Sequence, residues 1–326
     1  MKKRITGWIL VFVWLVSLLH ASAQGAQDYI RWVDFRVSYE AMEKALTLDI
    51  RSQEEELPTG WIKLLALAAC RTGGKVTAAA VDKAWKGTKE GKSPQEQLGE
   101  LYKYYDYYYK AYDAALGGLV GNFAILVEQN GQKQWKSTYG LKAFSPIAAG
   151  YGYSHYDDFG AGRNYGFKRK HLGNDLMGSL GTPIVAVEGG TVEAMGWNQY
   201  GGWRVGIRSA DKRRYYYYAH LQKDTPFAPG LEVGQKVQPG QLIGFMGRTG
   251  YSVKENINNI ETVHLHFGLQ LIFDESQKEC NSEIWIDVYN IVRLLGRHRC
   301  SWTRGKDGAW ERVYAFRDLD SAPLAQ

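Results

Sequence analysis

A change in residue patterning near Gly121 constrains the fold of this chain more than any other feature. Residues 28–118 place apolar side chains at three-to-four spacing, which is typical of amphipathic helices. Beyond Gly121, short apolar runs alternate with glycine and proline turns, which indicates antiparallel strands. We therefore expect an α+β protein with an α-helical accessory domain over 28–118, a mainly antiparallel β domain over 121–296 and a C-terminal tail over 297–326.

The helical region contains clear start and stop signals. Ser93, Pro94 and Glu96 together are typical of a capped helix start, and Gly73-Gly74 is typical of a helix end. The patterns predict helices over four segments: 39–50, 61–70, 78–85 and 94–116. No glutamate in this region stands in a context that indicates catalysis, so we interpret it as an accessory domain.

The second region predicts a series of short strands. Asn130-Gly131 separates two apolar runs and is a strong signal for a two-residue hairpin turn. The predicted strands are 122–128, 132–139, 184–187, 191–197, 203–208, 214–221, 233–237, 242–246 and 264–273, and a helix is predicted over 284–295. Many short strands with glycine and proline turns indicate an antiparallel sandwich or barrel.

The N-terminus has the pattern of an export signal. Three basic residues precede the apolar stretch 5–19, and Ala21-Ser22-Ala23 offers a small-x-small cleavage site. The alternative is a membrane anchor, but fifteen helical residues span roughly 22 Å, less than the roughly 30 Å of a bilayer core. We therefore predict a signal peptide over 1–23 and a protein located outside the cytoplasmic membrane, with membrane contact only if the leader is retained.

Charge and cysteine content argue against a nucleic-acid-binding protein and against a zinc site made of thiolates. The formal charge is +6, and removing the three basic residues of the leader leaves +3, too little to indicate a nucleic-acid partner. Cys70, Cys280 and Cys300 form no CxxC pattern, so a thiolate zinc site is not expected. Cys70 lies in an apolar stretch typical of a buried thiol. Cys280 and Cys300 are far enough apart to pair in an oxidising compartment, but their spacing does not establish a disulfide.

Four of the seven histidines fall into short motifs that suit a metal centre. The motifs are His171-x-x-x-Asp175, a tyrosine run ending at His220, and His264-Leu265-His266. Imidazole and carboxylate are usual ligands of catalytic zinc, which takes three protein ligands and keeps one position open. Each motif alone is weak, but their joint presence around β-hairpins is not expected by chance.

The spacing within these motifs separates metal binding from proton transfer. His264 and His266 lie on the same face of one strand, roughly 7 Å apart, so one is expected to bind metal and the other to contact water or substrate. Gly173 and Asn174 favour a turn that aims His171 and Asp175 at one ion. Because no HExxH motif supplies a glutamate base, His264 and His220 are the candidates for proton transfer. His155 and His298 have no partner motif and are assigned structural roles.

Residues 145–292 resemble the lysostaphin-type zinc endopeptidase family, which cuts peptide bonds in bacterial peptidoglycan. The resemblance rests on seven segments: His171-x-x-x-Asp175, residues 181–186, 189–192, Tyr218-Ala219-His220-Leu221, residues 233–237, 247–250 and His264-Leu265-His266-Phe267. Asn174 departs from the family, which often has an aliphatic residue there. The loop 252–262 is also longer than in minimal members.

The resemblance implies a specific site and substrate. It implies one Zn²⁺ per chain held by His171, Asp175 and His266, with His264 and His220 assisting catalysis. It also implies a duplicated hybrid motif fold, and peptidoglycan stems or cross-bridges as substrate, so that the protein would be secreted or cell-wall associated. Tyr217 and Arg163 are weaker candidates for substrate contact.

Two functions are compatible with this pattern. The first is a secreted zinc metalloendopeptidase that hydrolyses wall peptides. The second is a catalytically silent, wall-binding scaffold or activator that uses the same groove, as in relatives that have lost ligands. This chain keeps all five residues, which favours the enzyme. The pattern does not distinguish which wall peptide bond is cut, nor does it specify an oligomeric state.

Overall fold

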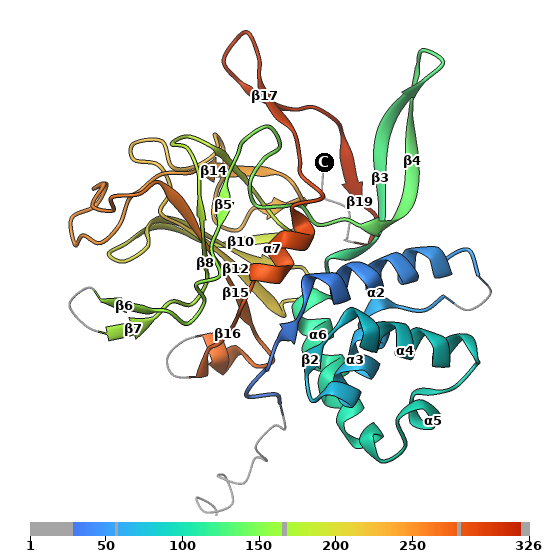
Figure 1. Cartoon of the computed structure of the whole chain (residues 1–326). Helices are drawn as coiled ribbons and strands as arrows, with labels where there is room; N and C mark the ends of the chain where they lie inside the picture. The colour runs from blue at the N-terminus through green and yellow to red at the C-terminus, as the bar shows by residue number, and fades with distance from the viewer. Residues whose placement is uncertain (1–28, 56–57, 165–167, 279–281, 321–326) are drawn as a thin grey trace, which may run out of the picture. The chain divides into compact units, whose positions relative to one another are not determined.

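The computed structural model describes residues 29–55, 58–164, 168–278 and 282–320 (Figure 1). The chain divides after Ile30, and all helices and strands named below belong to the second unit, which begins at Arg31. The predicted signal peptide and Cys280 lie outside the described residues. Cys70 and Cys300 are both buried free thiols. No helix in the described ranges combines the length and apolar character needed to cross a bilayer.

Five helices form the first part of the second unit: α2 (Tyr39–Ser52), α3 (Trp61–Thr72), α4 (Ala78–Lys89), α5 (Pro94–Leu98) and α6 (Tyr105–Leu116). Helix α3 packs against α2, α4 and α6, and most of its side chains are buried (Figure 1). Ser38 caps α2 through its side chain, and Gly73 ends α3 in the left-handed region at φ 59°. The first three predicted helices are therefore confirmed.

The single helix predicted from Pro94 to Leu116 is wrong, because the structure divides it. The capping box of Ser93 and Glu96 is present, but α5 ends at Leu98. Gly99 adopts φ 55°, a left-handed conformation that costs glycine little and that breaks the helix. A 3₁₀ segment, Gly99–Tyr104, then leads into α6.

An eight-stranded antiparallel sheet carries most of the β region, as expected from the sequence. Its main path runs β13-β10-β11-β12-β15-β8-β5, with β16 also paired to β15. The bounds are β5 Ser154–His155, β8 Asn174–Met177, β10 Gly190–Asn198, β11 Gly202–Ser209, β12 Arg214–Ala219, β13 Lys236–Val237, β15 His264–Leu271 and β16 Ile284–Ile286. A two-stranded sheet pairs β9 (Pro183–Val185) with β14 (Leu242–Phe245).

The predicted hairpin is present and is joined by the end of the chain. Strands β3 (Val120–Gln129) and β4 (Gln132–Leu141) pair around Asn130 and Gly131, which both have positive φ. Strand β19 (Phe316–Asp318) adds to β3, so part of the predicted C-terminal tail, 297–326, belongs to a sheet (Figure 1). The predicted tail also contains a second hairpin, formed by β17 (Trp302–Arg304) and β18 (Trp310–Arg312).

The helix predicted over 284–295 is wrong in its first third. Residues Ile284–Ile286 form strand β16, in which both isoleucines are buried and Trp285 faces the opposite side. This alternation has the period of a strand. Helix α7 spans only Tyr289–Leu295. Asn174 accepts a hydrogen bond from the backbone of Val288 at 3.1 Å, which fixes the start of α7 against β8.

A buried arginine joins the helical region to the large sheet. Arg214 pairs with Glu188 at 2.7 Å and donates to the carbonyl of Ala114 at 2.8 Å, near the end of α6. Its side chain is 1% exposed, and its charge is balanced by Glu188 together with Asp211 at 2.8 Å. The end of α6 is therefore tied to β12 by a polar contact.

Candidate metal centre

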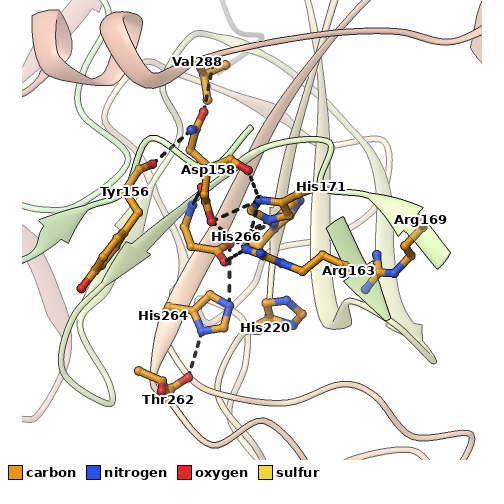
Figure 2. Close-up of polar contacts among 12 residues, drawn as sticks. Tyr156, Asp158, Arg163, Arg169, His171, His220, Thr262, His264, His266 and Val288 are labelled. Atoms are coloured by element: carbon orange, nitrogen blue, oxygen red, sulfur yellow. Dashed lines mark hydrogen bonds and ion pairs between the residues drawn. The ribbon is translucent and has the colours of Figure 1, made fainter. Parts of the chain in front are cut away.

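The register of two neighbouring strands brings the proposed ligands together. Strand β8 pairs with β15 so that Asp175 lies directly opposite His266, and His171 lies just before β8. His171 Nε2 is 2.8 Å from His266 Nδ1 and 3.0 Å from Asp175 Oδ1, and His266 Nδ1 is 3.2 Å from that oxygen. The structure thus brings together the three residues that the resemblance implies as ligands, two of which, His171 and His266, are labelled in Figure 2.

The size of this triangle suits a tetrahedral zinc ion. Metal–ligand distances of about 2.0–2.1 Å place neighbouring ligand atoms about 3.3–3.4 Å apart. The three measured separations, 2.8–3.2 Å, are close to that edge length. Three lone-pair atoms at this distance need a proton or a cation between them, so the arrangement is compatible with a shared metal ion.

Asp158 orients His171, and sequence analysis missed it. The backbone carbonyl of Asp158 lies 3.1 Å from His171 Nδ1, and its carboxylate lies 3.2 Å from the same nitrogen. A carbonyl oxygen only accepts, so Nδ1 carries the proton and Nε2 presents its lone pair to the centre. Asp158 Oδ1 also accepts from the backbone nitrogen of Asp175 at 3.2 Å. One residue therefore holds two ligands in place.

Arg163 also lies within the centre, although the sequence made it only a weaker candidate for substrate contact. It is carried by β6 (Gly162–Asn164), which pairs with β7 (Lys168–Lys170). Its Nη2 is 3.0 Å from Asp175 Oδ2 and 2.6 Å from Asp158 (Figure 2). The contact engages the carboxylate oxygen that does not face His171. Asp175 is therefore left with Oδ1 as its single ligand atom.

Gly173 is required by the close approach of β15. A Cβ at this position would lie 2.6 Å from the carbonyl oxygen of Phe267 and 2.8 Å from His266 Cε1. Any side chain would therefore displace the His266 ring or the strand. The turn between His171 and Asp175 needs glycine for space.

The other two histidines of the motifs, His264 and His220, have the same ring nitrogen hydrogen-bonded. His264 Nδ1 lies 2.8 Å from the carbonyl of Thr262, and His220 Nδ1 lies 2.9 Å from the carbonyl of Thr249. Both Nδ1 atoms are therefore donors, which leaves Nε2 as the acceptor whenever the ring is neutral. The two rings are 4.7 Å apart (Figure 2), and His264 Nε2 is 3.8 Å from Asp175 Oδ1.

Burial and neighbouring charges shift the ionisation of this cluster. Burial lowers the pKa of His220 well below its usual range, and the nearby His264 and His266 lower it further. Burial would raise the pKa of Asp175, but hydrogen bonds to His171 and His266 outweigh it and bring this pKa well below its usual range. Neutral imidazole beside an ionised carboxylate is the state in which these groups bind metal.

A cavity of about 1100 Å³ lies over the centre and the large sheet. Tyr217 lies in its floor, with its ring 5.8 Å from the ring of His266. Arg169 and Arg204 line the same cavity. His155 and His298 are not among its lining residues: they stack on Tyr289 at 4.5 Å and on Phe144 at 4.0 Å.

The comparison with protein families identifies the β region. Residues 169–279 match the model of Peptidase family M23. The chain carries a peptidase family M23 domain. The matched segment contains His171, Asp175, His220, His264 and His266.

Curated proteins similar to this region include an endopeptidase and lysostaphin. The chain is 36% identical to the L-Ala–D-Glu endopeptidase of Bacillus subtilis over 152 residues, 47% of this chain and 44% of the relative. It is 34% identical to lysostaphin of Staphylococcus simulans over 135 residues, 41% of this chain and 22% of the relative. The match thus spans less than half the length of these curated relatives.

A solved structure extends the likeness of fold beyond the M23 domain. A provisionally assigned glycyl-glycine endopeptidase, LytM, from Ruminococcus gnavus aligns with 84% of this chain and 92% of its own. The TM-score is 0.51 and the sequence identity 24%, so the likeness is one of fold. The α+β architecture, with strands mostly antiparallel, agrees with that of M23 peptidases.

Proposed function

We propose that this protein is a zinc metalloendopeptidase that hydrolyses peptide bonds in bacterial peptidoglycan. The convergence of His171 Nε2, Asp175 Oδ1 and His266 Nδ1 carries the proposal. Two neutral imidazoles and one carboxylate are a ligand set that suits catalytic zinc. Membership of the M23 family and the names of its relatives support a peptidase that acts on wall peptides.

The residues beside the ligands suit the proton transfers of amide hydrolysis. Zinc held by the three ligands would act as a Lewis acid on the scissile carbonyl and lower the pKa of a water. His264 Nε2, an acceptor 3.8 Å from Asp175 Oδ1, takes the proton of the attacking water. The resulting imidazolium donates that proton to the leaving amine. His220, whose ring lies beside His264, contacts the carbonyl oxygen as charge develops.

The location follows from the proposed substrate and the predicted leader. Peptidoglycan lies outside the cytoplasmic membrane, so the enzyme must be exported to reach it. The basic, apolar and small residues of 1–23 would supply the signal. N-terminal sequencing of secreted material tests this: a mature terminus near Gln24 supports cleavage, and an intact leader in a membrane fraction supports the anchor instead.

Activity and metal content separate the enzyme from a silent scaffold. Full-length protein is expected to contain about one zinc per chain and to release defined peptides from purified peptidoglycan, as shown by mass analysis. Removal of zinc by a chelator should stop release, and added zinc should restore it. Zinc-loaded protein that binds peptidoglycans of several cross-link types but cuts none would establish the scaffold.

A further inference from the structure

Two arginines in the cavity beside the metal centre have no acidic partner among the described residues. Arg169 lies on β7 and Arg204 on β11, and both are half-buried. The Nε–H group of each is buried without a hydrogen-bond acceptor. A buried guanidinium is usually paired, so two such groups in one cavity need an explanation.

The two guanidinium groups lie around the same side chain, Tyr217. Arg204 is 6.0 Å from the centre of the Tyr217 ring. Arg169 stacks on the rings of Tyr200 and Tyr251 at 5.3 and 5.4 Å and donates to the Tyr251 hydroxyl at 2.9 Å. Burial raises the pKa of Tyr217 to about 12, against the opposing influence of both arginines, so its hydroxyl stays protonated. The cluster is therefore a set of donors with a net charge of about +2.

None of the acidic residues that line the cavity forms an ion pair with Arg169 or Arg204 among the described residues. Glu261 and Glu283 line it, and Glu283 accepts a hydrogen bond from Trp285 Nε1 at 2.7 Å. Glu193 lines the cavity, but its carboxylate already pairs with Arg208 at 2.9 Å and with Lys278. Asp175 is engaged by Arg163 and by the ligand histidines. The charge of Arg169 and Arg204 is thus available to a ligand that enters the cavity.

The cluster lies close to the bond that would be cut. The Tyr217 ring is 5.8 Å from the ring of His266, and Tyr251 is 6.0 Å from His220. An extended peptide advances about 3.3–3.6 Å per residue. A substrate bound at the metal centre therefore places the side chain or branch of a residue one or two positions away against the arginines.

We propose that Arg169, Arg204 and Tyr217 form a carboxylate subsite. The preferred substrate is then a wall peptide with a free carboxylate within one or two residues of the scissile amide, rather than a bridge made only of glycine. This inference rests on the proposed function and adds the substrate class. Guanidinium groups recognise carboxylates by charge-assisted hydrogen bonds, which a neutral glycine chain does not offer.

The test compares one peptide in two forms. A synthetic stem peptide with a free glutamate carboxylate next to the susceptible bond, the same peptide amidated at that carboxylate, and pentaglycine are offered to the zinc-loaded full chain. Amidation is expected to lower kcat/KM about 10- to 100-fold, mainly through KM. Arg204→Gln should remove that difference, and Arg204→Lys should restore part of it. Arg317→Gln, at an exposed position of β19 that does not line the cavity, should leave it unchanged.

Binding measured without turnover tests the carboxylate subsite separately from the proposed peptidase activity. Calorimetry on His264→Ala protein should show the same preference for the free carboxylate, and its loss when Arg204→Gln is added. Equal binding of the acid and the amide overturns the subsite, even if both are cleaved. Preferred binding of the acid without cleavage by otherwise wild-type, zinc-loaded protein supports the subsite and overturns the proposed function.

Discussion

The helical region and the metal centre differ in how far apart in sequence their decisive contacts lie. Helices α2, α3 and α4 are specified by side chains three or four residues apart and by caps such as Ser38 and Gly73. The centre joins His171 to His266, 95 residues later, through the register of β8 with β15. Local signals therefore locate the helices, while the site exists only once the sheet is complete.

The largest expected effect is loss of the metal from a protein that stays folded. His266→Ala and Asp175→Ala each remove one of three ligands, so zinc occupancy and peptidoglycan cleavage should both fall to background. Elemental analysis and product release measure the two effects. Circular dichroism should show the helical signal unchanged, because no helix contributes a ligand. Loss of that signal in Asp175→Ala would mean that the helical region needs an intact metal centre in order to fold.

His264→Ala should separate catalysis from metal binding within the same strand. Three ligands remain, so zinc should stay bound. Turnover should fall about 10²–10⁴-fold through kcat, the range for loss of one positioned proton-transfer group. Zinc content and kcat, measured beside His266→Ala, decide the assignment. Zinc lost from His264→Ala but kept by His266→Ala would reverse the two roles.

Asp158→Asn should weaken zinc binding about 10- to 100-fold without abolishing it. The backbone carbonyl still orients His171 Nδ1, but the negative charge beside that nitrogen and beside Arg163 is lost. Competition with a chelator of known affinity measures the change. Asp157→Asn, at the neighbouring position, is the matched control. Equal weakening of zinc binding in both variants would show that Asp158 does not orient His171.

A fragment of residues 119–326 tests how separable the two regions are. It should fold and bind zinc, because all three ligands lie in the β region. Its melting temperature should fall by about 5–10 °C, since Arg214 loses the carbonyl of Ala114 and the 3.3 Å contact to that of Asp113. An insoluble, zinc-free fragment would show that both regions share one core. Higher activity than the full chain would make the helical region an inhibitor.

Tyr139→Phe should give the smallest effect, a loss of about 1 kcal/mol in the free energy of unfolding. Its hydroxyl donates to Asp49 at 2.9 Å, which links β4 to α2. Asp49 keeps its bond from the backbone of Trp61 at 3.0 Å, so α2 and α3 should stay joined. Denaturant unfolding of this variant and the wild type gives the difference, and zinc affinity should be the same in both.

Sequence analysis predicted the parts of the molecule that depend on short-range patterns. The hairpin at Asn130-Gly131 and the start of α3 at Trp61 follow from turn and period signals. The break at Gly99 was missed because an isolated glycine is tolerated in many helices. Strand β16 was missed because Ile284–Ile286 is too short to show a period and lies directly before α7.

The motifs of the centre were found because histidine is rare and its spacing is diagnostic. Asp158 was missed, and Arg163 was underweighted, because neither belongs to a motif: each acts through a short strand or loop that the sequence did not resolve into elements. Gly173 was noted only as a turn residue. Its need for space becomes visible when β15 is placed against it.

The place of β19 has a consequence for synthesis of the protein. The hairpin β3–β4 is complete by Leu141, but the strand that covers the edge of β3 ends at Asp318. A growing chain therefore carries an open β edge while residues 142–315 are made, and such an edge is a template for pairing with other chains. A ribosome that stops before Phe316 would release a protein with its ligands in place and one edge unprotected.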